Sequence, residues 1–253
     1  KRMDLRPGAM RQRRRTVEHP FGTIKAWMGS THFLMKRLPY NAETAFAPVT
    51  IVAEAPNVLV TNQAFPVSSF SDLLAFAKSN PDKMTFGTQG VGTTGHVTGE
   101  LINQLTGLGL THVAYQGFPP ALTDVLAGRV GMMIGDTINL VPRIRSGQLR
   151  PIAIASARRS TVLPQVPTFA EAKLAGMEAV TFFSIVAPPG TSKETAAYAQ
   201  KAFAAALAAP DVRQKFADQG AVPAGWTPER TGEFIRAESD RWSRVVKSAN
   251  VSV

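Results

Sequence analysis

From residue 40 onward, hydrophobic positions follow two alternating patterns. Short runs rich in β-branched and aromatic residues, typical of buried strands, occupy residues 49–53, 57–61, 84–88, 110–115, 130–136, 149–156 and 181–190. Runs with apolar residues three or four positions apart, which indicate amphipathic helices, occupy residues 70–80, 96–105, 119–128 and 138–147. Strand-like and helix-like runs alternate four times, which predicts an α/β fold: a mainly parallel sheet with helices on both faces.

End signals in the sequence support several of these helices. Ser69 can cap the first helix, and Pro81 ends it. Gly128 closes the third helix, whose first turn carries proline, and Pro142 is expected to bend the fourth. Farther along the chain, long helices are predicted over residues 193–208, 210–218 and 228–248.

The net charge of +10 is spread unevenly. Residues 1–39 hold 10 Lys and Arg against Asp4 and Glu18, which leaves 18 basic and 16 acidic residues for residues 40–253. This larger part is nearly neutral, so its charge gives no reason to expect nucleic-acid binding. The chain has no cysteine, which excludes disulfides, thiolate zinc sites and cysteine nucleophiles. No run of apolar residues is long enough to span a membrane.

The run GVGTTG, from Gly90 to Gly95, matches the G-x-G-x-x-G pattern of dinucleotide-binding turns. It follows a predicted strand and precedes a predicted helix, as such a turn should. A dinucleotide site also needs an acidic residue about 20 positions on, but Tyr115 and Gln116 stand there. We therefore expect no cofactor, and the turn either binds nothing or holds another kind of anion.

Three successive strand-to-helix turns, GTQGVGTTGH, YQGFPP and GDTINL, share small and hydroxyl-bearing residues. Each lies at the N-terminus of a predicted helix, where unpaired backbone N–H groups and the helix dipole favour anions. A parallel sheet brings such turns together at the carboxyl ends of its strands. Thr88, Thr93 and Thr94 can add neutral hydroxyl donors, so the turns predict a site for a carboxylate ligand.

Motifs for catalysis and for metal binding are absent from the sequence. It contains no G-x-S-x-G elbow, no phosphate-binding P-loop and no H-E-x-x-H. The histidines show no ligand spacing, so we expect neither a metal site nor an enzyme. His96, in the first turn of a helix, either packs and caps or contacts the ligand. Asp136 either caps the next helix, orders a water or binds an amino group on the ligand.

Residues from about 38 to 253 resemble the periplasmic solute-binding receptors of tripartite tricarboxylate transporters, the Bug or TctC family. The order and spacing of six stretches carry the resemblance: LPYNAETAFAPVTIVAEAPNVLVTN, FGTQGVGTTGHVTGELI, HVAYQGFPPALTDVLAGRV, LRPIAIASARRSTVLPQVPTFAEA, FFSIVAPPGTS and PDVRQKFADQGAVPAG.

The resemblance implies a two-lobed binding protein of the type II, Venus-flytrap kind, which closes about a hinge on a small carboxylate or related anion. The receptor then delivers its solute to membrane transporter subunits. In this family the glycine-rich turn, with the two turns that follow it, lines the ligand site. The candidate ligand-binding residues are Thr88, Gly90, Gly92, Thr93, Thr94, His96, Tyr115, Gly117, Asp136 and Thr137.

The sequence departs from the family where it begins. Family members open with a signal peptide and then a strand, a ligand loop and a helix of the first lobe, none of which precedes residue 38. We therefore expect a complete second lobe, a truncated first lobe and impaired binding. The predicted ranges are 1–39 for a separate basic segment, 40–82 and 220–253 for the partial first lobe with the C-terminal helices, and 83–219 for the second lobe with the crossover segments.

Residues 13–39 resemble the C-terminal part of an insertion-sequence transposase with a DDE core. The signature Y-x2-R-x3-E-x6-K falls on Arg11, Arg14, Glu18 and Lys25, with arginine in place of tyrosine. The aspartates that share the metal ions with such a glutamate have no counterpart here. The alternative to a receptor is therefore a non-functional fusion or a DNA-binding remnant, and we expect nucleic-acid contact only through residues 1–39. The family implies a periplasmic location, whereas a chain lacking an export signal would stay in the cytoplasm if expressed as written.

Overall fold

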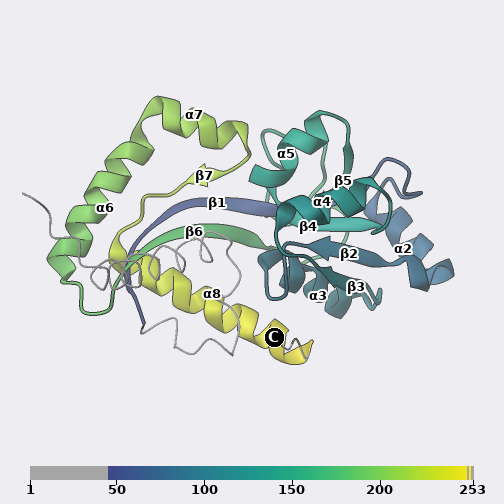
Figure 1. The fold of residues 1–253 in the computed structure, drawn as a ribbon, viewed down its shortest axis with the longest axis horizontal. Coiled ribbons are helices and arrows are strands. Elements are labelled where there is room, and N and C mark those ends of the chain that lie inside the picture. The colour runs from purple at the N-terminus through teal and green to yellow at the C-terminus, as the bar shows by residue number, and fades with distance from the viewer. Residues whose placement is uncertain (1–44, 250, 252–253) are drawn as a thin grey trace, which may run out of the picture.

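The computed structural model describes residues 45–249 and residue 251, so the predicted transposase-like segment lies outside the described residues. The strands are β1 (Ala47–Asn62), β2 (Thr85–Thr88), β3 (Thr111–Ala114), β4 (Met132–Asp136), β5 (Leu149–Ile154), β6 (Val180–Ala187) and β7 (Val222–Pro223). The helices are α2 (Phe70–Ser79), the short 3₁₀ helix η2 (Pro81–Lys83), α3 (Thr94–Thr106), α4 (Phe118–Leu126), α5 (Thr137–Arg145), α6 (Lys193–Ala208), α7 (Pro210–Asp218) and α8 (Pro228–Ser248). Figure 1 shows an elongated molecule in which β1 and β6 extend away from a region of shorter strands and helices.

Strand β1 is one continuous strand of 16 residues, where the sequence pattern predicted two short runs. Its first part pairs antiparallel with β6, from Ala47 to Pro56. Its second part, from Asn57 onward, lies between β4 and β5 and pairs antiparallel with both. The two predicted runs are joined because hydrogen-bonding partners continue along the strand through the residues between them. The same strand therefore belongs to both parts of the molecule.

The larger sheet has the order β3-β2-β4-β1-β5. Strands β3, β2 and β4 are parallel, as the alternating pattern predicted. Strand β1 runs against its neighbours, so the sheet is mixed and the prediction of a mainly parallel sheet holds only for part of it. The pattern could not show this because β1 is separated from β5 by almost ninety residues of sequence.

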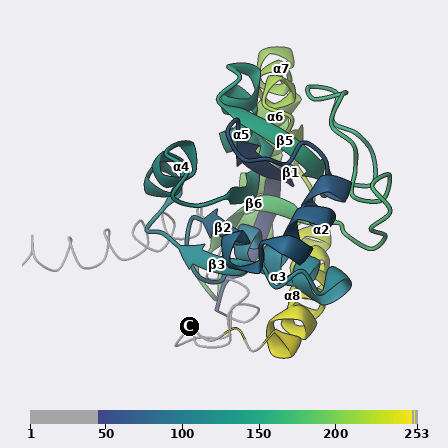
Figure 2. The ribbon, with the colours of Figure 1, turned by 90° about the vertical axis from the view of Figure 1, so that its right-hand side faces the viewer.

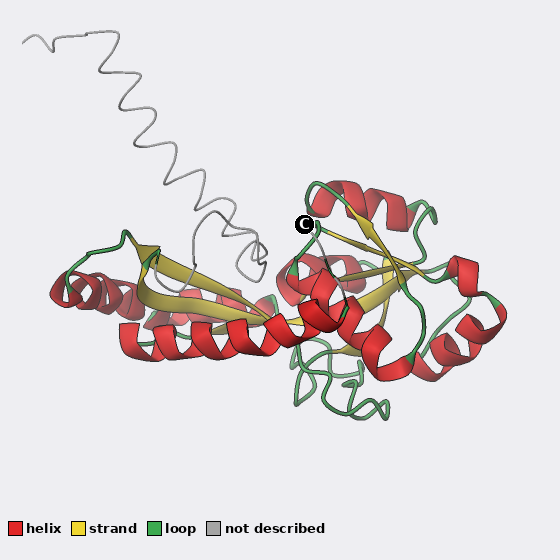
Figure 3. Cartoon of the chain, turned by 90° about the horizontal axis from the view of Figure 1, so that it is seen from below, coloured by secondary structure: helices red, strands yellow, loops and turns green. Residues whose placement is uncertain are grey.

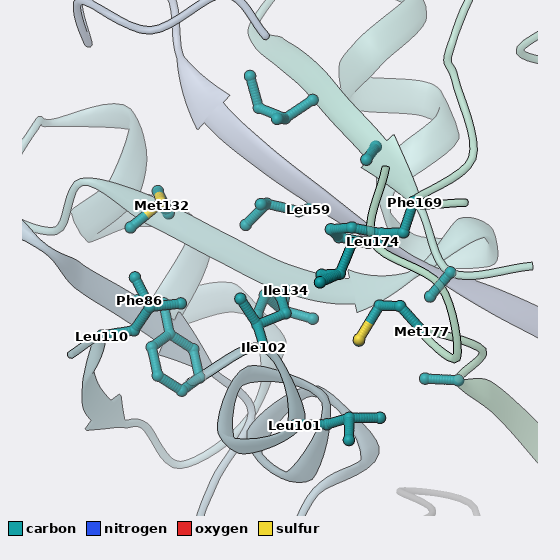
Figure 4. Close-up of a cluster of buried hydrophobic side chains, with 14 of the residues drawn as sticks. Leu59, Phe86, Leu101, Ile102, Leu110, Met132, Ile134, Phe169, Leu174 and Met177 are labelled. Atoms are coloured by element: carbon teal, nitrogen blue, oxygen red, sulfur yellow. The ribbon is translucent and has the colours of Figure 1, made fainter. Parts of the chain in front are cut away.

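Helices cover both faces of this sheet, as predicted. Met132 and Ile134 of β4 point into a cluster that includes residues of α2, α3 and the end of α8, and Figure 4 shows part of this cluster. Met133 points to the other face, into a cluster with residues of α4 and α5. Figure 2 shows α4 and α3 on opposite sides of the strands. The alternation of side chains along one strand thus fixes both layers of helices.

The remaining helices lie along the extension formed by β1 and β6. Helices α6 and α8 both contact β1, and α7 contacts β7. Figure 3 shows α8 running from the extension toward the larger sheet, where Trp242 is buried in the cluster that also holds Phe70 of α2. Both α2 and the end of α8 therefore pack with the larger sheet, whereas the predicted ranges that divide the chain into lobes remain a prediction.

The predicted helices after residue 190 have the predicted bounds. Helix α3 begins two residues earlier than predicted because Thr93 caps it and accepts a hydrogen bond from the backbone N–H of His96. Pro142 lies inside α5, as predicted, whereas the two-residue strand β7 was missed. None of the helices in the described part of the chain is long and apolar enough to cross a membrane.

Two glycines let α3 lie very close to the strands beneath it. A Cβ on Gly99 would come within 2.2 Å of the Phe86 ring, and a Cβ on Gly95 within 2.5 Å of the carbonyl oxygen of Ile134. A larger residue fits at neither position unless the helix or the group that it meets shifts. These contacts fix where the N-terminus of α3 lies relative to the ends of β2 and β4.

We expect Gly99→Ala to lower the free energy of unfolding by about 1–3 kcal/mol, because the added methyl overlaps the Phe86 ring. This loss should appear although alanine favours a helix over glycine by about 1 kcal/mol. Urea unfolding of the two proteins measures the difference. In a Phe86→Leu background, which removes the ring, the same glycine substitution should cost clearly less; an equal cost in both backgrounds would contradict the contact.

Candidate functional site

The three turns singled out in the sequence lie at one edge of the larger sheet. Strands β2, β3 and β4 are parallel, so the turns that follow them meet at their carboxyl ends. The backbone N–H of Tyr115 donates to the carbonyl of Thr88 (3.2 Å), and that of Gly117 to the carbonyl of Gln89 (3.0 Å). The first and second turns are therefore joined by backbone hydrogen bonds.

The first turn is built on two glycines with positive φ. Gly90 has φ +148° and Gly92 has φ +73°, a left-handed conformation that favours glycine. The N–H of Gly92 donates to Nδ1 of His96 at 3.0 Å, and Thr93 caps α3. The ring of His96 thus holds the backbone of the turn from inside the first helical turn. This contact agrees with the packing or capping alternative for His96, and contact with a ligand stays a prediction.

Several donors of this turn remain available. Among the hydrogen bonds of the described residues, the backbone N–H groups of Val91, Thr94 and Gly95 have no partner. The hydroxyl of Thr94 also has none in this set, and the hydroxyl of Thr93 accepts from His96 and keeps its own proton to donate. These groups lie at the positive end of a helix of 13 residues, which is suited to an anion.

A second histidine, His112, belongs to the same cluster and was not among the predicted site residues. Its ring stacks on His96 with centroids 3.7 Å apart and planes 14° apart. Its Nε2 lies 2.6 Å from Oγ1 of Thr88, whose hydroxyl also bonds the Gly90 backbone. The register that aligns His112 with Phe86 creates this contact, and the sequence alone carries no signal for that register.

Burial of the His112 ring, and then the facing His96, lower the pKa of His112 from its ordinary 6.5 to about 4. On the other side of His96, Glu100 lies 3.6 Å from Nε2. The hydrogen bond with His96 is the main reason that the pKa of Glu100 is lowered. At neutral pH the His112 ring is therefore uncharged, next to a charged carboxylate that faces His96.

In the second turn, the side chain of Tyr115 is engaged by another residue of the protein. The hydroxyl of Tyr115 donates to Oδ2 of Asp124 at 2.8 Å. Burial, followed by this hydrogen bond, raises the pKa of Tyr115 to about 12. Asp124 in turn pairs with Arg129. Gly117 precedes α4 with φ +106°. The second turn can therefore present backbone groups to a ligand, whereas the hydroxyl of Tyr115 is already hydrogen-bonded.

The third turn carries the one buried carboxylate of the candidate set. Asp136 caps α5, accepting from the N–H of Asn139, and both of its oxygens accept from the Asn139 amide. The capping role is thus observed among the three that the sequence left open. Thr137 donates to the carbonyl of Gly220 at 3.0 Å, which ties this turn to the segment after α7. No group of His, Cys, Asp and Glu within the described residues could hold a metal ion.

Comparison with known proteins gives the context for this site. Residues 22–251 match the family described as tripartite tricarboxylate transporter family receptor; the match begins inside the segment 1–39. Protein BugT of Bordetella pertussis is 35% identical over 220 residues, which cover 87% of this chain and 68% of BugT. The chain spans 64% and 68% of the length of two curated relatives that it matches.

Solved structures agree in fold. An R. palustris protein solved with adipate is 34% identical, with a TM-score of 0.83 over 89% of this chain and 76% of that one. MatC from Rhodopseudomonas palustris, solved with bound malate, is 30% identical, with a TM-score of 0.79 over 87% of this chain and 76% of MatC. The predicted periplasmic-binding-protein-like α/β fold is therefore confirmed.

The lowered pKa of His112 predicts how stability depends on pH. Between about pH 4 and pH 6.5 the unfolded chain binds more protons than the folded one. The contribution of His112 to the free energy of unfolding should therefore be complete above about pH 6.5. It should be lost progressively as the pH drops toward 4. Urea unfolding at about pH 7.5 and about pH 5 measures this change.

The matched control is His112→Gln, because the amide can still reach Thr88 but the side chain does not titrate. Its stability should fall less than that of the original chain over the same pH interval. Asp72, Asp124 and Glu171 also have lowered pKa values, but both proteins share them. An equal fall in both proteins would contradict the role of His112.

Proposed function

Because the chain belongs to the family of tripartite tricarboxylate transporter receptors, we propose that it is an extracytoplasmic solute-binding receptor for a small carboxylate or related anion. The observation that carries this proposal is the first turn, where the N–H groups of Val91, Thr94 and Gly95 have no hydrogen-bond partner within the part of the chain that the structure describes. Similar proteins solved with adipate and with malate support the ligand class.

The first turn would hold one carboxylate of the ligand. Backbone N–H groups, the helix dipole and the hydroxyls of Thr93 and Thr94 all favour negative charge there without a cationic side chain. The remaining predicted residues, at the second and third turns, would shape the site around the rest of the ligand. Asp136, engaged with Asn139, offers no donor to a second carboxylate, so the second carboxylate of a dicarboxylate would lie away from this residue.

We propose further that binding closes the molecule about its hinge, and that the closed form delivers the solute to membrane transporter subunits. Residue Asn57 of β1 lies where the extension meets the larger sheet, bonded through its backbone to Ala155 and Ala179. Three chain segments therefore cross side by side at this point, as a hinge requires. In this role the protein acts in the periplasm and carries out no reaction.

For residues 1–39 we propose an origin in an insertion-sequence transposase, on the strength of Arg14, Glu18 and Lys25. The family match from residue 22 overlaps this segment, so residues 22–39 carry both resemblances. A second candidate function, DNA binding through this basic segment, rests on its charge.

Binding at the first turn can be tested with paired glycine substitutions at the two ends of α3. Gly92 (φ +73°) and Gly107 (φ +68°) have nearly the same backbone conformation, so alanine should cost each variant about 1–2 kcal/mol of stability. Only Gly92→Ala should also weaken the binding of adipate or malate, by about tenfold or more. Isothermal titration of the full chain with both dicarboxylates measures this difference.

Gly107→Ala is the control, since its added methyl meets nothing within 4 Å and it lies at the far end of the helix. Equal binding by the two variants would place the ligand elsewhere. The receptor proposal would be overturned if neither dicarboxylate binds and no amino acid or aromatic acid raises the melting temperature of the chain.

Deletion of residues 1–39 separates the two candidate functions. If the basic segment binds DNA, affinity for a duplex should fall steeply as salt rises and should disappear in the shortened chain. Carboxylate binding should persist in that chain if the described residues form the site. Unchanged DNA affinity after the deletion would contradict the second candidate.

A further inference from the structure

The ring of His96 accepts a hydrogen bond from the backbone of the candidate anion turn. The N–H of Gly92 points at Nδ1 of His96 over 3.0 Å, so this nitrogen must carry a lone pair and no proton. The proton of the neutral ring is then on Nε2, which faces Glu100. Gly92 has the left-handed conformation, and within the described residues its backbone N–H donates to the ring of His96 alone.

A second uncharged ring lies against the first. His112 stacks on His96 and reaches Thr88, and Phe86 of β2 packs beside both rings. Among the described residues, Glu100 is the one charged group that pairs with either ring. Two positive rings at this separation would repel each other, so a proton on one ring opposes the addition of a proton to the other.

We propose that His96 and His112 are positioning residues that keep the turn at residues 90–94 in its anion-binding shape only while both rings are uncharged, so that proton uptake by the pair releases the carboxylate. The inference rests on the proposed function and assigns to the same site a dependence on pH. Neither residue needs to touch the ligand.

The physical reason lies in the direction of one hydrogen bond. A proton added to Nδ1 of His96 turns the acceptor into a donor that faces another donor, the N–H of Gly92. The turn then loses the contact that holds its left-handed residue. A new positive charge would by itself favour an anion, but with Glu100 against the same ring the protonated pair carries no net charge and forms no cationic site. Loss of shape should therefore outweigh the electrostatic gain.

The first experiment follows the turn without any ligand. In the full chain labelled with ¹⁵N, the ring nitrogens of both histidines and the backbone amides of Gly90 and Gly92 are recorded by NMR from about pH 7.5 to about pH 4.5. The Nδ1 of His96 should be unprotonated at the upper limit. The Gly92 amide should shift and exchange faster with the same midpoint as the His96 ring. A Gly92 amide that does not respond when the ring titrates would overturn the inference.

The second experiment measures the affinity for adipate or malate at the same two pH values. The original chain should bind about tenfold more weakly at the lower pH, because one hydrogen bond of the turn becomes a repulsive contact. In His96→Asn the amide oxygen can still accept from Gly92 but cannot be protonated. Whatever its affinity at neutral pH, the affinity of this variant should change clearly less between the two pH values than that of the original chain.

A third protein, His96→Phe, keeps a ring to stack on His112 but offers no acceptor. It should bind weakly at both pH values, near the level of the original chain at low pH. Protonation of the ligand itself affects all three proteins alike, so the differences between them report the histidine. An equal pH response in His96→Asn and the original chain would overturn the inference while leaving the receptor proposal intact. If the original chain binds no carboxylate at neutral pH, the receptor proposal fails and the NMR titration still decides the role of the pair.

Discussion

The backbone pairing of strand β1 is the constraint on which the rest of the structure depends. This strand pairs with β6 along its first part and is held between β4 and β5 along its second. At the junction, Asn57 bonds to Ala155 and Ala179 through its backbone and to Ala179 and Thr181 through its side-chain amide. Because one strand serves both regions, every element of the larger sheet is linked to the extension through this shared strand.

From this sheet the arrangement of the turns follows by close packing. Gly95 and Gly99 bring α3 onto the ends of β2 and β4 with no room for a side chain between them. The N-terminus of α3 is thereby held at the edge where the other two turns arrive. A site made of backbone N–H groups needs such rigid support, because its donors cannot reorient individually as side chains can.

At the carboxyl ends of β2, β3 and β4, the groups of the candidate site are uncharged, apart from two carboxylates that already have partners. Asp136 is occupied by Asn139, and Glu100 faces His96. In the proposed site, a ligand held by dipoles and hydroxyls can be released without separating an ion pair, which suits the proposed delivery of the solute. Such a site also depends strongly on the conformation of its backbone. The proposed role of His96 and His112 is to hold that conformation.

The sequence by itself determined most of the helices and strands, and it predicted the kind of chemistry. The bounds of α6, α7 and α8 follow from caps and apolar spacing, which act within a few residues. Tyr115 and Gln116 stand where a dinucleotide site needs an acid, so the sequence favoured another anion at the glycine-rich turn, and this stays a prediction. Only the tertiary structure decided that β1 is continuous and antiparallel to its neighbours, and that His112 lies on His96. Both depend on register between strands distant in sequence, which is set by packing of the whole sheet and leaves no local pattern.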